Sequence, residues 1–333
     1  MSTRSQKKKA LIFGITGQDG SYLAELLLEK GYEVHGMIRK SATGNTRNIQ
    51  HLLEDDTIHN QRLFTHRGDL ADTTSLFRIV NQVQPDELYN EADQDHVVWS
   101  YEMPDYSYII TGAAVGRILE VIRQVSPKTK FFQPVTSNMF GIPFETPQTE
   151  MTPFNPQSPY ACAKVLSSVL VKHYREAYGI FASTGILYNH ESPRRTDEYV
   201  TRKITKAAAR ISLGLQDQLV LGDLSARIDW GLSREYMEAA WSILQCPDPD
   251  DFVIATGEAH SVKEFVYEAF NYVGLDPDKY VSSSKSLLRP TVTGLLIGDT
   301  TKAKSAFGFS PKVRLKDLIQ IMVESDLADN RAT

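Results

Sequence analysis

The sequence has few of the residues that build disulfide frameworks or metal sites. Its 333 residues include only two cysteines, Cys162 and Cys246, and neither stands at a metal-ligand spacing from other cysteines or from the eight histidines. A disulfide-stabilised fold and a zinc site are therefore not expected. Such sparing use of cysteine fits a reducing compartment, and we expect no bound metal.

Long hydrophobic runs and a secretory signal are also missing. No stretch of about 18 apolar residues occurs, so no membrane-spanning helix is expected. The N-terminus lacks the apolar core and small-residue cleavage site of a signal peptide. Lys and Arg number 36 against 41 Asp and Glu, which gives a net charge of −5 and argues against bulk binding to nucleic acid. We expect a cytoplasmic protein without membrane or nucleic-acid partners.

Short apolar runs instead alternate with helical patterns. Ala10–Phe13 is followed by a glycine-rich turn, by a helical pattern that closes at Gly31, and by a strand at Glu33–Ile38. This order is a βαβ unit. Further strand-like runs are 62–66, 87–90 and 131–136, with helical patterns at 74–82 and 111–125. The alternation predicts an α/β fold, a Rossmann doubly wound parallel sheet.

The regular alternation of strand-like and helical patterns becomes less clear after about residue 190. We expect a dinucleotide-binding Rossmann domain over residues 8–190 and a smaller mixed α/β lobe, mainly for substrate, over 191–330. The division is expected to be interleaved, with strands near 219–222 and 252–256 returning to the main sheet.

The first chemical signal is the turn Gly14–Gly20, which follows a strand and opens a helix. Glycines allow the backbone to approach a pyrophosphate closely, and the helix N-terminus supplies amide donors and a positive dipole end. This context predicts dinucleotide binding. The candidate cofactor ligands in the turn are Gly14, Thr16, Gly17, Gln18, Asp19 and Gly20.

The second strand ends in Arg39 and Lys40, where a site that prefers NAD usually has an acid. Two cations suit a ribose 2′-phosphate better, because Arg can bind it bidentately. The sequence therefore favours NADP, with NAD as the alternative. After the third strand, Asp69 and Leu70 are expected beside the cofactor, where Asp69 either accepts from the adenine amino group or caps the next helix.

The second signal is Tyr160 and Lys164, four residues apart and hence on one face of a helix. An ammonium at this position lowers the phenol pKa and can bind the nicotinamide ribose, so that the tyrosine exchanges a proton with a substrate hydroxyl. Thr136, at the end of a strand, can supply a second hydroxyl. Together the three residues form the constellation of a short-chain dehydrogenase/reductase.

Three stretches, Gly14–Gly20, Gly185–Arg195 and Val200–Thr205, resemble the GDP-mannose 4,6-dehydratase family. The resemblance runs from about Lys9 to Asp326. It implies an extended short-chain dehydrogenase/reductase that binds NADP, acts on nucleotide-activated sugars and forms a homodimer or homotetramer. The family's triad matches Thr136, Tyr160 and Lys164. Its contacts to the sugar nucleotide imply substrate-binding roles for Asn189, Arg195, Lys203 and Arg289.

The chain departs from the family at chemically important positions. The family has a glutamate, the base that removes the C5 proton, where this chain has Asn138, and an amide cannot take up a proton. Ile228 replaces an arginine and Val292 a glutamate of the sugar-nucleotide site, and Arg227 is a candidate to replace the lost cation. Three new acids appear after the fourth strand, and alternation would place them on one side if the strand continued that far. They are Glu91, Asp93 and Asp95.

Three functions remain open from the sequence. The first is an NAD(P)-dependent enzyme that oxidises a nucleotide-linked sugar at C4, a GDP-sugar by resemblance, and then epimerises or re-reduces it. The absence of the glutamate favours this function, because neither outcome needs a carbon acid–base group. The second is a GDP-mannose 4,6-dehydratase whose base has moved to Asp93 or Asp95. The third is a catalytically silent homologue that binds nucleotide sugars.

Overall fold

The computed structural model describes residues 7–42, 44–287 and 294–331. Its described residues form two compact units, each built from several segments of the chain. The first unit contains the residues up to Met139 together with Pro156–Ile186 and Met237–Phe252. The second contains Phe140–Asn155, Leu187–Tyr236 and the residues from Val253 onward.

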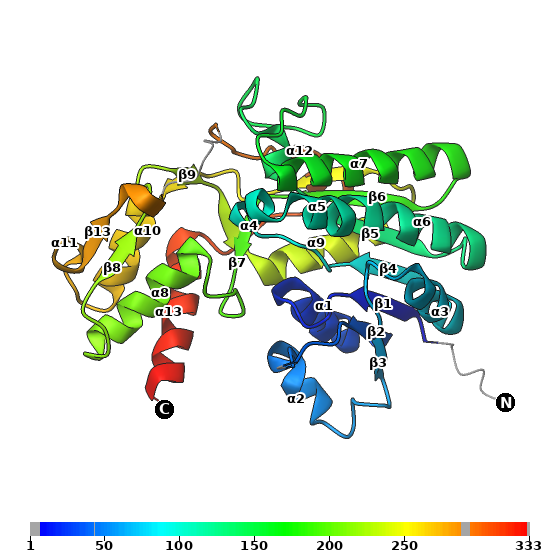
Figure 1. Ribbon diagram of the computed structural model, residues 1–333, viewed down its shortest axis with the longest axis horizontal. Coiled ribbons are helices and arrows are strands. Elements are labelled where there is room, and N and C mark those ends of the chain that lie inside the picture. Colours follow the sequence, from blue (N-terminus) through cyan, green and yellow to red (C-terminus); the bar gives the residue numbers. More distant parts are fainter. Residues whose placement is uncertain (1–6, 43, 288–293, 332–333) are drawn as a thin grey trace. The chain divides into compact units, whose positions relative to one another are not determined.

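A seven-stranded sheet in the order β11-β6-β5-β4-β1-β2-β3 organises the first unit (Figure 1). Strand β1 pairs in parallel with β2 and β4, and the pairs β2–β3 and β4–β5 are parallel as well. The strands are β1 (Lys9–Phe13), β2 (Glu33–Ile38), β3 (Leu63–Arg67), β4 (Glu87–Asn90), β5 (Lys130–Thr136), β6 (Ala182–Leu187) and β11 (Asp251–Ile254).

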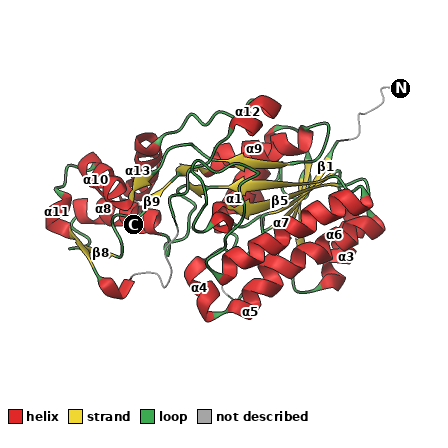
Figure 2. Ribbon diagram, turned by 90° about the horizontal axis from the view of Figure 1, so that it is seen from above, coloured by secondary structure: helices red, strands yellow, loops and turns green. Residues whose placement is uncertain are grey.

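Helices cover both faces of this sheet. Figure 2 shows α3, α6 and α7 along one face and α9 on the opposite face. The helices of this region are α1 (Gln18–Glu29), α2 (Gln50–Leu53), α3 (Thr73–Val83), α4 (Val97–Glu102), α5 (Pro104–Ser107), α6 (Ala114–Val125), α7 (Pro159–Tyr178) and α9 (Ser233–Gln245), with 3₁₀ turns η1 (Arg47–Ile49) and η3 (Ser137–Phe140) and a π-helical turn η2 (Tyr108–Ala113). The apolar stripes of α3 and α6 pack with Leu11, Phe13 and Leu88 of the sheet in one core, as amphipathic helices on a buried sheet should.

The described part of the second unit has its own core and three two-stranded sheets. Its core joins α8, α10 and α13 around Trp230 and Phe265. Its elements are β7 (Asn189–Glu191), α8 (Val200–Ser212), β8 (Leu219–Leu221), β9 (Arg227–Ile228), β10 (Trp230–Leu232), β12 (His260–Ser261), α10 (Val262–Tyr272), α11 (Pro277–Tyr280), β13 (Val281–Ser283), η4 (Lys285–Leu287), α12 (Thr301–Phe307) and α13 (Leu315–Arg331). None of the described helices is long and apolar enough to cross a membrane.

The two strands expected to return to the main sheet behave differently. β11 joins the main sheet beside β6. The expectation for 219–222 is wrong, because β8 pairs in parallel with β13 in a separate two-stranded sheet. Leu219 and Leu221 are buried in the core of the second unit, so their apolar character reflects that core.

A histidine pair, one member buried and the other half-buried, links β2 to β3. His35 Nδ1 lies 2.9 Å from His66 Nε2, and His35 Nε2 lies 3.0 Å from a Glu33 oxygen. Burial, together with the neighbouring His35 and Arg78, lowers the pKa of His66 to about 4. Burial also lowers the pKa of His35, although Glu33 opposes this shift.

This pair should make the protein less stable in acid. The unfolded state takes up a proton near the ordinary histidine pKa of about 6.5, whereas folded His66 remains neutral to about pH 4, so stability falls as the pH drops through this window. Allowing for partial solvent access, we expect a loss on the order of 1 kcal/mol in the free energy of unfolding. Urea titrations at several pH values should show a shallower decline in His66→Gln, and parallel curves for the two proteins would contradict this assignment.

Candidate functional site

The turn between β1 and α1 can be built only from glycine at two positions. Gly14 has φ +80°, and a Cβ there would lie 2.6 Å from the backbone nitrogen of Ala92. A Cβ on Gly20 would lie 2.3 Å from the Gly14 carbonyl oxygen. The Gly17 amide donates to the same oxygen at 2.9 Å and closes the turn. The glycines therefore bring β1, α1 and the loop after β4 into close backbone contact.

The first turn of α1 has the features of an anion site. Its N-cap residue, Gly17, has no side chain to accept from the first amides of the helix. Amides at a helix N-terminus can bind a phosphate, which the helix dipole also favours. Thr16 is held by Asn48, whose side-chain amide donates to its carbonyl at 3.1 Å, and by Asn45, which donates to its hydroxyl at 3.2 Å. The residues present thus fit the pyrophosphate of a dinucleotide.

The residues expected around the adenosine end lie on the same edge of the sheet. Arg39 and Lys40 follow β2 and are exposed. Arg39 Nη1 donates to the Tyr106 hydroxyl at 2.8 Å, which holds the guanidinium in place. Asp69 accepts from the Ala71 amide at 2.9 Å. The neighbouring Leu70 is buried in the core of this unit.

The capping role considered for Asp69 is wrong. Asp72 is the N-cap residue of α3, and its carboxylate accepts from the amides of Thr74 and Ser75. It is the residue directly before the helix, from which a side chain reaches the second and third amides.

Tyr160 and Lys164 lie in the first turns of α7, which Ser158 caps by accepting from the Ala161 amide. Both side chains are buried, Tyr160 with 7% and Lys164 with 3% of its surface exposed. Lys164 Nζ lies 5.7 Å from the centroid of the Tyr160 ring. Thr136, the last residue of β5, lies close enough to the Tyr160 phenol for its hydroxyl to act to lower the pKa of that group. The three residues predicted as a triad therefore lie together within the first unit.

Asn138 is part of the same cluster. It lies in η3, directly after β5, and its side-chain amide donates to the Thr136 hydroxyl at 3.1 Å. Its backbone amide donates to the same hydroxyl at 3.2 Å. Position 138 therefore faces the triad, and there it offers an amide and no carboxylate.

The three new acids are placed differently from one another. β4 ends at Asn90, so Glu91, Asp93 and Asp95 lie beyond the strand. The expectation that strand alternation would place these three side chains on one side therefore does not apply. Glu91 and Asp93 are partly buried, whereas Asp95 is exposed. Asp93 Oδ2 lies 2.5 Å from Lys164 Nζ, and Asp93 Oδ1 accepts from the Gln94 amide at 2.7 Å.

These contacts shift the ionisation of the cluster. Burial, with smaller contributions from Asp93 and Asp95, raises the pKa of Tyr160 to about 12, although the Lys164 ammonium acts to lower it. Burial opposes the charge on Lys164, but Asp93, Tyr160 and Asp95 outweigh this effect and raise its pKa. Burial also raises the pKa of Glu91 well above its usual range, and Asp19 adds to the shift.

The residues expected to bind substrate belong to the second unit. Asn189 lies in β7 opposite Trp230, and Lys203 is exposed on α8. The Arg195 guanidinium lies 3.4 Å from the centroid of the Tyr199 ring, and its Nε is 3.5 Å from a Glu191 oxygen. Arg195 is thus held by its own loop.

The idea that Arg227 replaces the cation lost at position 228 finds no support. Arg227 donates to the Ala259 carbonyl at 2.5 Å. Neighbouring side chains on a strand point to opposite faces, so Arg227 and Ile228 of β9 do not reach the same place. Arg289 and Val292 lie outside the described residues.

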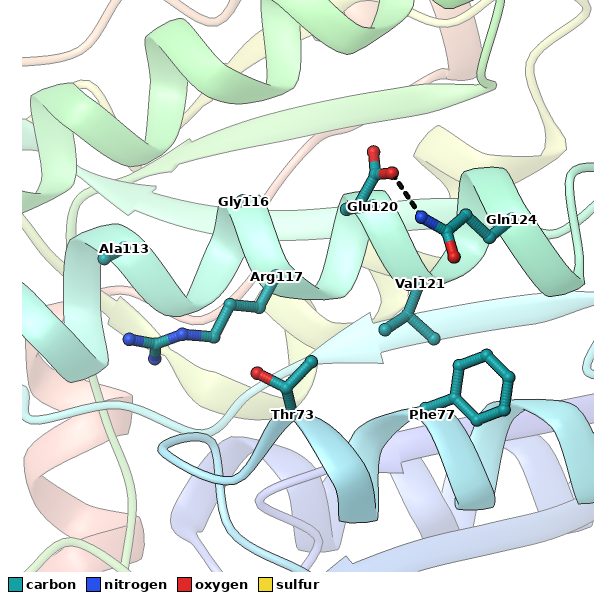
Figure 3. Close-up of a pocket in the computed structure, with 8 residues that line it drawn as sticks. All are labelled: Thr73, Phe77, Ala113, Gly116, Arg117, Glu120, Val121 and Gln124. Atoms are coloured by element: carbon teal, nitrogen blue, oxygen red, sulfur yellow. Dashed lines mark hydrogen bonds between the residues drawn. The ribbon is translucent and has the colours of Figure 1, made fainter.

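Two partners were missed from the sequence, Tyr106 beside Arg39 and Asn48 beside Thr16. Each is distant along the chain from the residue it holds, and neither forms a local motif. A surface hollow between α3 and α6, lined by Thr73, Phe77, Arg117 and Glu120 among others, shares no residue with the predicted sites (Figure 3). Among the described residues no group of three or more His, Cys, Asp or Glu side chains could hold a metal ion.

Solved structures of related architecture support the fold. The dTDP-glucose 4,6-dehydratase DesIV from Streptomyces venezuelae, solved with NAD and TYD bound, superposes with a TM-score of 0.85 at 21% identity, over 97% of this chain and 98% of that chain. RMD from Pseudomonas aeruginosa, solved with NADPH, gives a TM-score of 0.78 at 17% identity over 97% and 98% of the two chains. The predicted Rossmann α/β class is confirmed.

Closer relatives identify the family. GDP-mannose 4,6 dehydratase 1 of Arabidopsis thaliana is 48% identical over 326 residues, covering 96% of this chain and 90% of the relative. The human GDP-mannose 4,6 dehydratase is 44% identical over 340 residues, covering 96% and 91%. A family model described as GDP-mannose 4,6 dehydratase matches residues 11–322. The predicted enzyme type, a nucleotide-sugar epimerase or dehydratase of the short-chain dehydrogenase/reductase type, is thereby confirmed, and the chain belongs to the GDP-mannose 4,6-dehydratase family.

Proposed function

We propose that this protein oxidises or reduces a GDP-linked sugar at C4 with NADP and does so without net loss of water, by epimerisation or re-reduction. Family membership supports the substrate class. The observation that carries the proposal is Asn138, an amide that contacts the Thr136 hydroxyl where the family resemblance implies a carboxylate base. The same resemblance leads us to infer a homodimer or homotetramer.

In this proposal Tyr160 exchanges a proton with the C4 oxygen, and the Thr136 hydroxyl holds that oxygen and the phenol in line. When bound, the nicotinamide cofactor accepts or supplies the hydride at C4. Lys164, fixed by the Pro134 carbonyl at 2.8 Å, places a positive charge near the Tyr160 ring and is available to the nicotinamide ribose. Proton exchange of this kind contributes about 10²–10⁴-fold in rate.

Asn138 argues against dehydration on chemical grounds. Loss of water across C5 and C6 begins with removal of the C5 proton, and an amide accepts no proton at any accessible pH. Asn138 also uses its side-chain nitrogen on Thr136, at 3.1 Å. Rotation of a C4 ketone followed by its reduction needs no base at C5, and a simple reduction needs none either.

Dehydration with a relocated base is the second candidate, and identities of up to 48% to proteins named dehydratases favour it. Asp93 is poorly suited to the role, because one carboxylate oxygen lies against Lys164 and the other accepts from the Gln94 amide. Asp95 is the better-placed alternative. A catalytically silent homologue is a weaker candidate, because Thr136, Tyr160 and Lys164 are all present and adjacent.

Product mass distinguishes these functions. We would incubate the protein with GDP-mannose and, separately, with UDP- and dTDP-linked hexoses, together with NADP⁺, and analyse each product by mass spectrometry. Epimerisation retains the mass and dehydration loses 18 units, the mass of one water. A product that is lighter by one water would reject the proposal, and turnover of only a UDP- or dTDP-sugar would reject its GDP component.

Arg39 and Lys40 should make the protein prefer NADP to NAD. Arg39 and Lys40 follow β2, where they would bind a ribose 2′-phosphate, and Tyr106 holds the Arg39 guanidinium. We expect Arg39→Ala to weaken NADP by about tenfold or more and NAD by far less, because only NADP loses a charge-assisted contact. Calorimetric titration with both cofactors measures the two dissociation constants. Equal weakening would show that Arg39 does not read the 2′-phosphate.

A further inference from the structure

The ion pair between Asp93 and Lys164 is the least expected feature of the site. The 2.5 Å contact joins side chains that are only 13% and 4% exposed. Lys164 Nζ is also fixed from β5 by the Pro134 carbonyl at 2.8 Å, and Asp93 Oδ1 accepts from the Gln94 amide. Neither partner is therefore a mobile surface group, and the carboxylate is built into the surroundings of the triad.

This carboxylate changes the electric field at Tyr160. A lone ammonium 5.7 Å from the ring stabilises a phenolate. When a carboxylate lies 2.5 Å from the ammonium, Tyr160 faces a dipole whose field falls off more steeply than that of a single charge. Burial is the largest cause of the raised pKa of Tyr160, and Asp93 offsets part of the lowering effect of Lys164 on the phenol.

Other charged groups around the pair act in the same direction. Asp95 adds a negative charge that also disfavours the phenolate. Glu91 interacts electrostatically with Asp19, Lys164 and Asp93, and burial together with Asp19 raises its pKa, so that this carboxyl contributes little charge. Lys164 is a cation whose charge acts on Tyr160, and Asp93 is its direct counter-ion.

We propose that Asp93 is a positioning residue that neutralises Lys164, keeps Tyr160 protonated and thereby fits this enzyme to reduce a nucleotide-linked 4-keto sugar. This proposal rests on the function proposed above and selects reduction over epimerisation. Reduction needs a phenol that donates a proton to the C4 oxygen, which Tyr160 supplies across the neutral pH range. Oxidation of the alcohol needs the phenolate.

The rates of oxidation and of reduction at C4 should depend very differently on pH. With a Tyr160 pKa of about 12, only about one phenol in 10⁴ is ionised at pH 8. The oxidation rate should therefore rise tenfold per pH unit throughout the assay range, while the reduction rate stays level. A 4-keto sugar must come from a separate reaction that oxidises or dehydrates a nucleotide sugar at C4, so this enzyme would act after such a step.

The kinetic test compares Asp93→Asn with wild type in both directions. Single-turnover absorbance at 340 nm follows oxidation of GDP-mannose with NADP⁺, and reduction of a GDP-4-keto-6-deoxy sugar with NADPH. Removing the negative charge should lower the pH at which the oxidation rate stops rising by about one to two pH units. It should also raise the oxidation rate at pH 7.5 by about tenfold or more. Reduction should not rise. Asp93→Glu, which restores the carboxylate, should behave as wild type.

A matched control is Glu120→Gln, which removes the carboxylate of the exposed ion pair with Arg123 at 2.7 Å. It should leave both profiles unchanged. If Asp93→Asn loses activity equally in both directions with no shift of the pH profile, Asp93 has only a structural role. If its oxidation profile matches wild type, the proposal is overturned.

A second measurement needs no sugar turnover. Protein labelled at the tyrosine ¹³Cζ reports phenol ionisation directly, and the Tyr160 resonance is assigned as the one absent from Tyr160→Phe. Its ionisation should begin about one to two pH units lower in Asp93→Asn than in wild type, with or without NADP⁺. Identical titrations would overturn the role of Asp93. A shifted titration without turnover of any nucleotide sugar would leave that role standing and reject the proposed function.

Discussion

Tyr160→Phe is expected to lower hydride transfer by about 10²–10⁴-fold while leaving nucleotide-sugar binding nearly unchanged. The substitution removes one oxygen and keeps the ring of a residue that is only 7% exposed, so packing is preserved. What is lost is the only proton that the proposal assigns to the C4 oxygen. Stopped-flow absorbance of the cofactor measures the transfer, and calorimetry measures binding.

Tyr101→Phe is the matched control for this prediction. Tyr101 donates to the Gln157 carbonyl at 2.9 Å, in the same unit as Tyr160. Its loss should cost about 1 kcal/mol of stability and leave the rate of hydride transfer within a few-fold of wild type. If Tyr160→Phe also stays within a few-fold of wild type, the proton that moves with the hydride comes from another group.

The parts of the fold that local sequence determines were predicted well. β4 has the predicted bounds, Glu87–Asn90, α3 extends one residue beyond its predicted bounds at each end, and β5 begins one residue earlier than predicted. These elements are buried on the sheet, so the apolar period in the sequence follows directly from their packing. The prediction that Leu219–Leu221 joins the main sheet was wrong, because three apolar residues indicate a strand with buried side chains but not the sheet to which it belongs.

The site was predicted to the extent that its residues occur in motifs. Tyr160, Lys164 and the glycines of Gly14–Gly20 lie at spacings that chemistry dictates, and their neighbourhoods follow from a strand–turn–helix order. The contact between Asp93 and Lys164 has no such spacing. The acids after β4 could be recognised as unusual, but only the path of the loop decides which of them meets the ammonium.

The wild-type protein should not dehydrate GDP-mannose. With GDP-mannose and NADP⁺ in heavy water, we expect no 4-keto-6-deoxy product and no deuterium at C5, because C5 deprotonation needs a base within about 3 Å. Because the 4-keto sugar must first form by oxidation at C4, Asn138→Glu should create this activity when combined with Asp93→Asn, on the order of 10²–10⁴-fold above Asp93→Asn alone, since the side chain at position 138 contacts Thr136 directly. Mass spectrometry for the loss of water and NMR for deuterium at C5 measure the two events.

Asn138→Gln separates chemistry from shape in that experiment. Glutamine has the length of glutamate but accepts no proton, so Asn138→Gln should remain unable to dehydrate the sugar. Dehydration by the wild-type protein would point to a base elsewhere in the site. If wild-type protein forms the 4-keto-6-deoxy product at an ordinary rate and Asp95→Asn abolishes it, Asp95 is the relocated base. A base that approaches from the loop after β4, and not from η3, would then have to reach C5 within about 1 Å of the productive geometry, since a larger error costs about a hundredfold in rate.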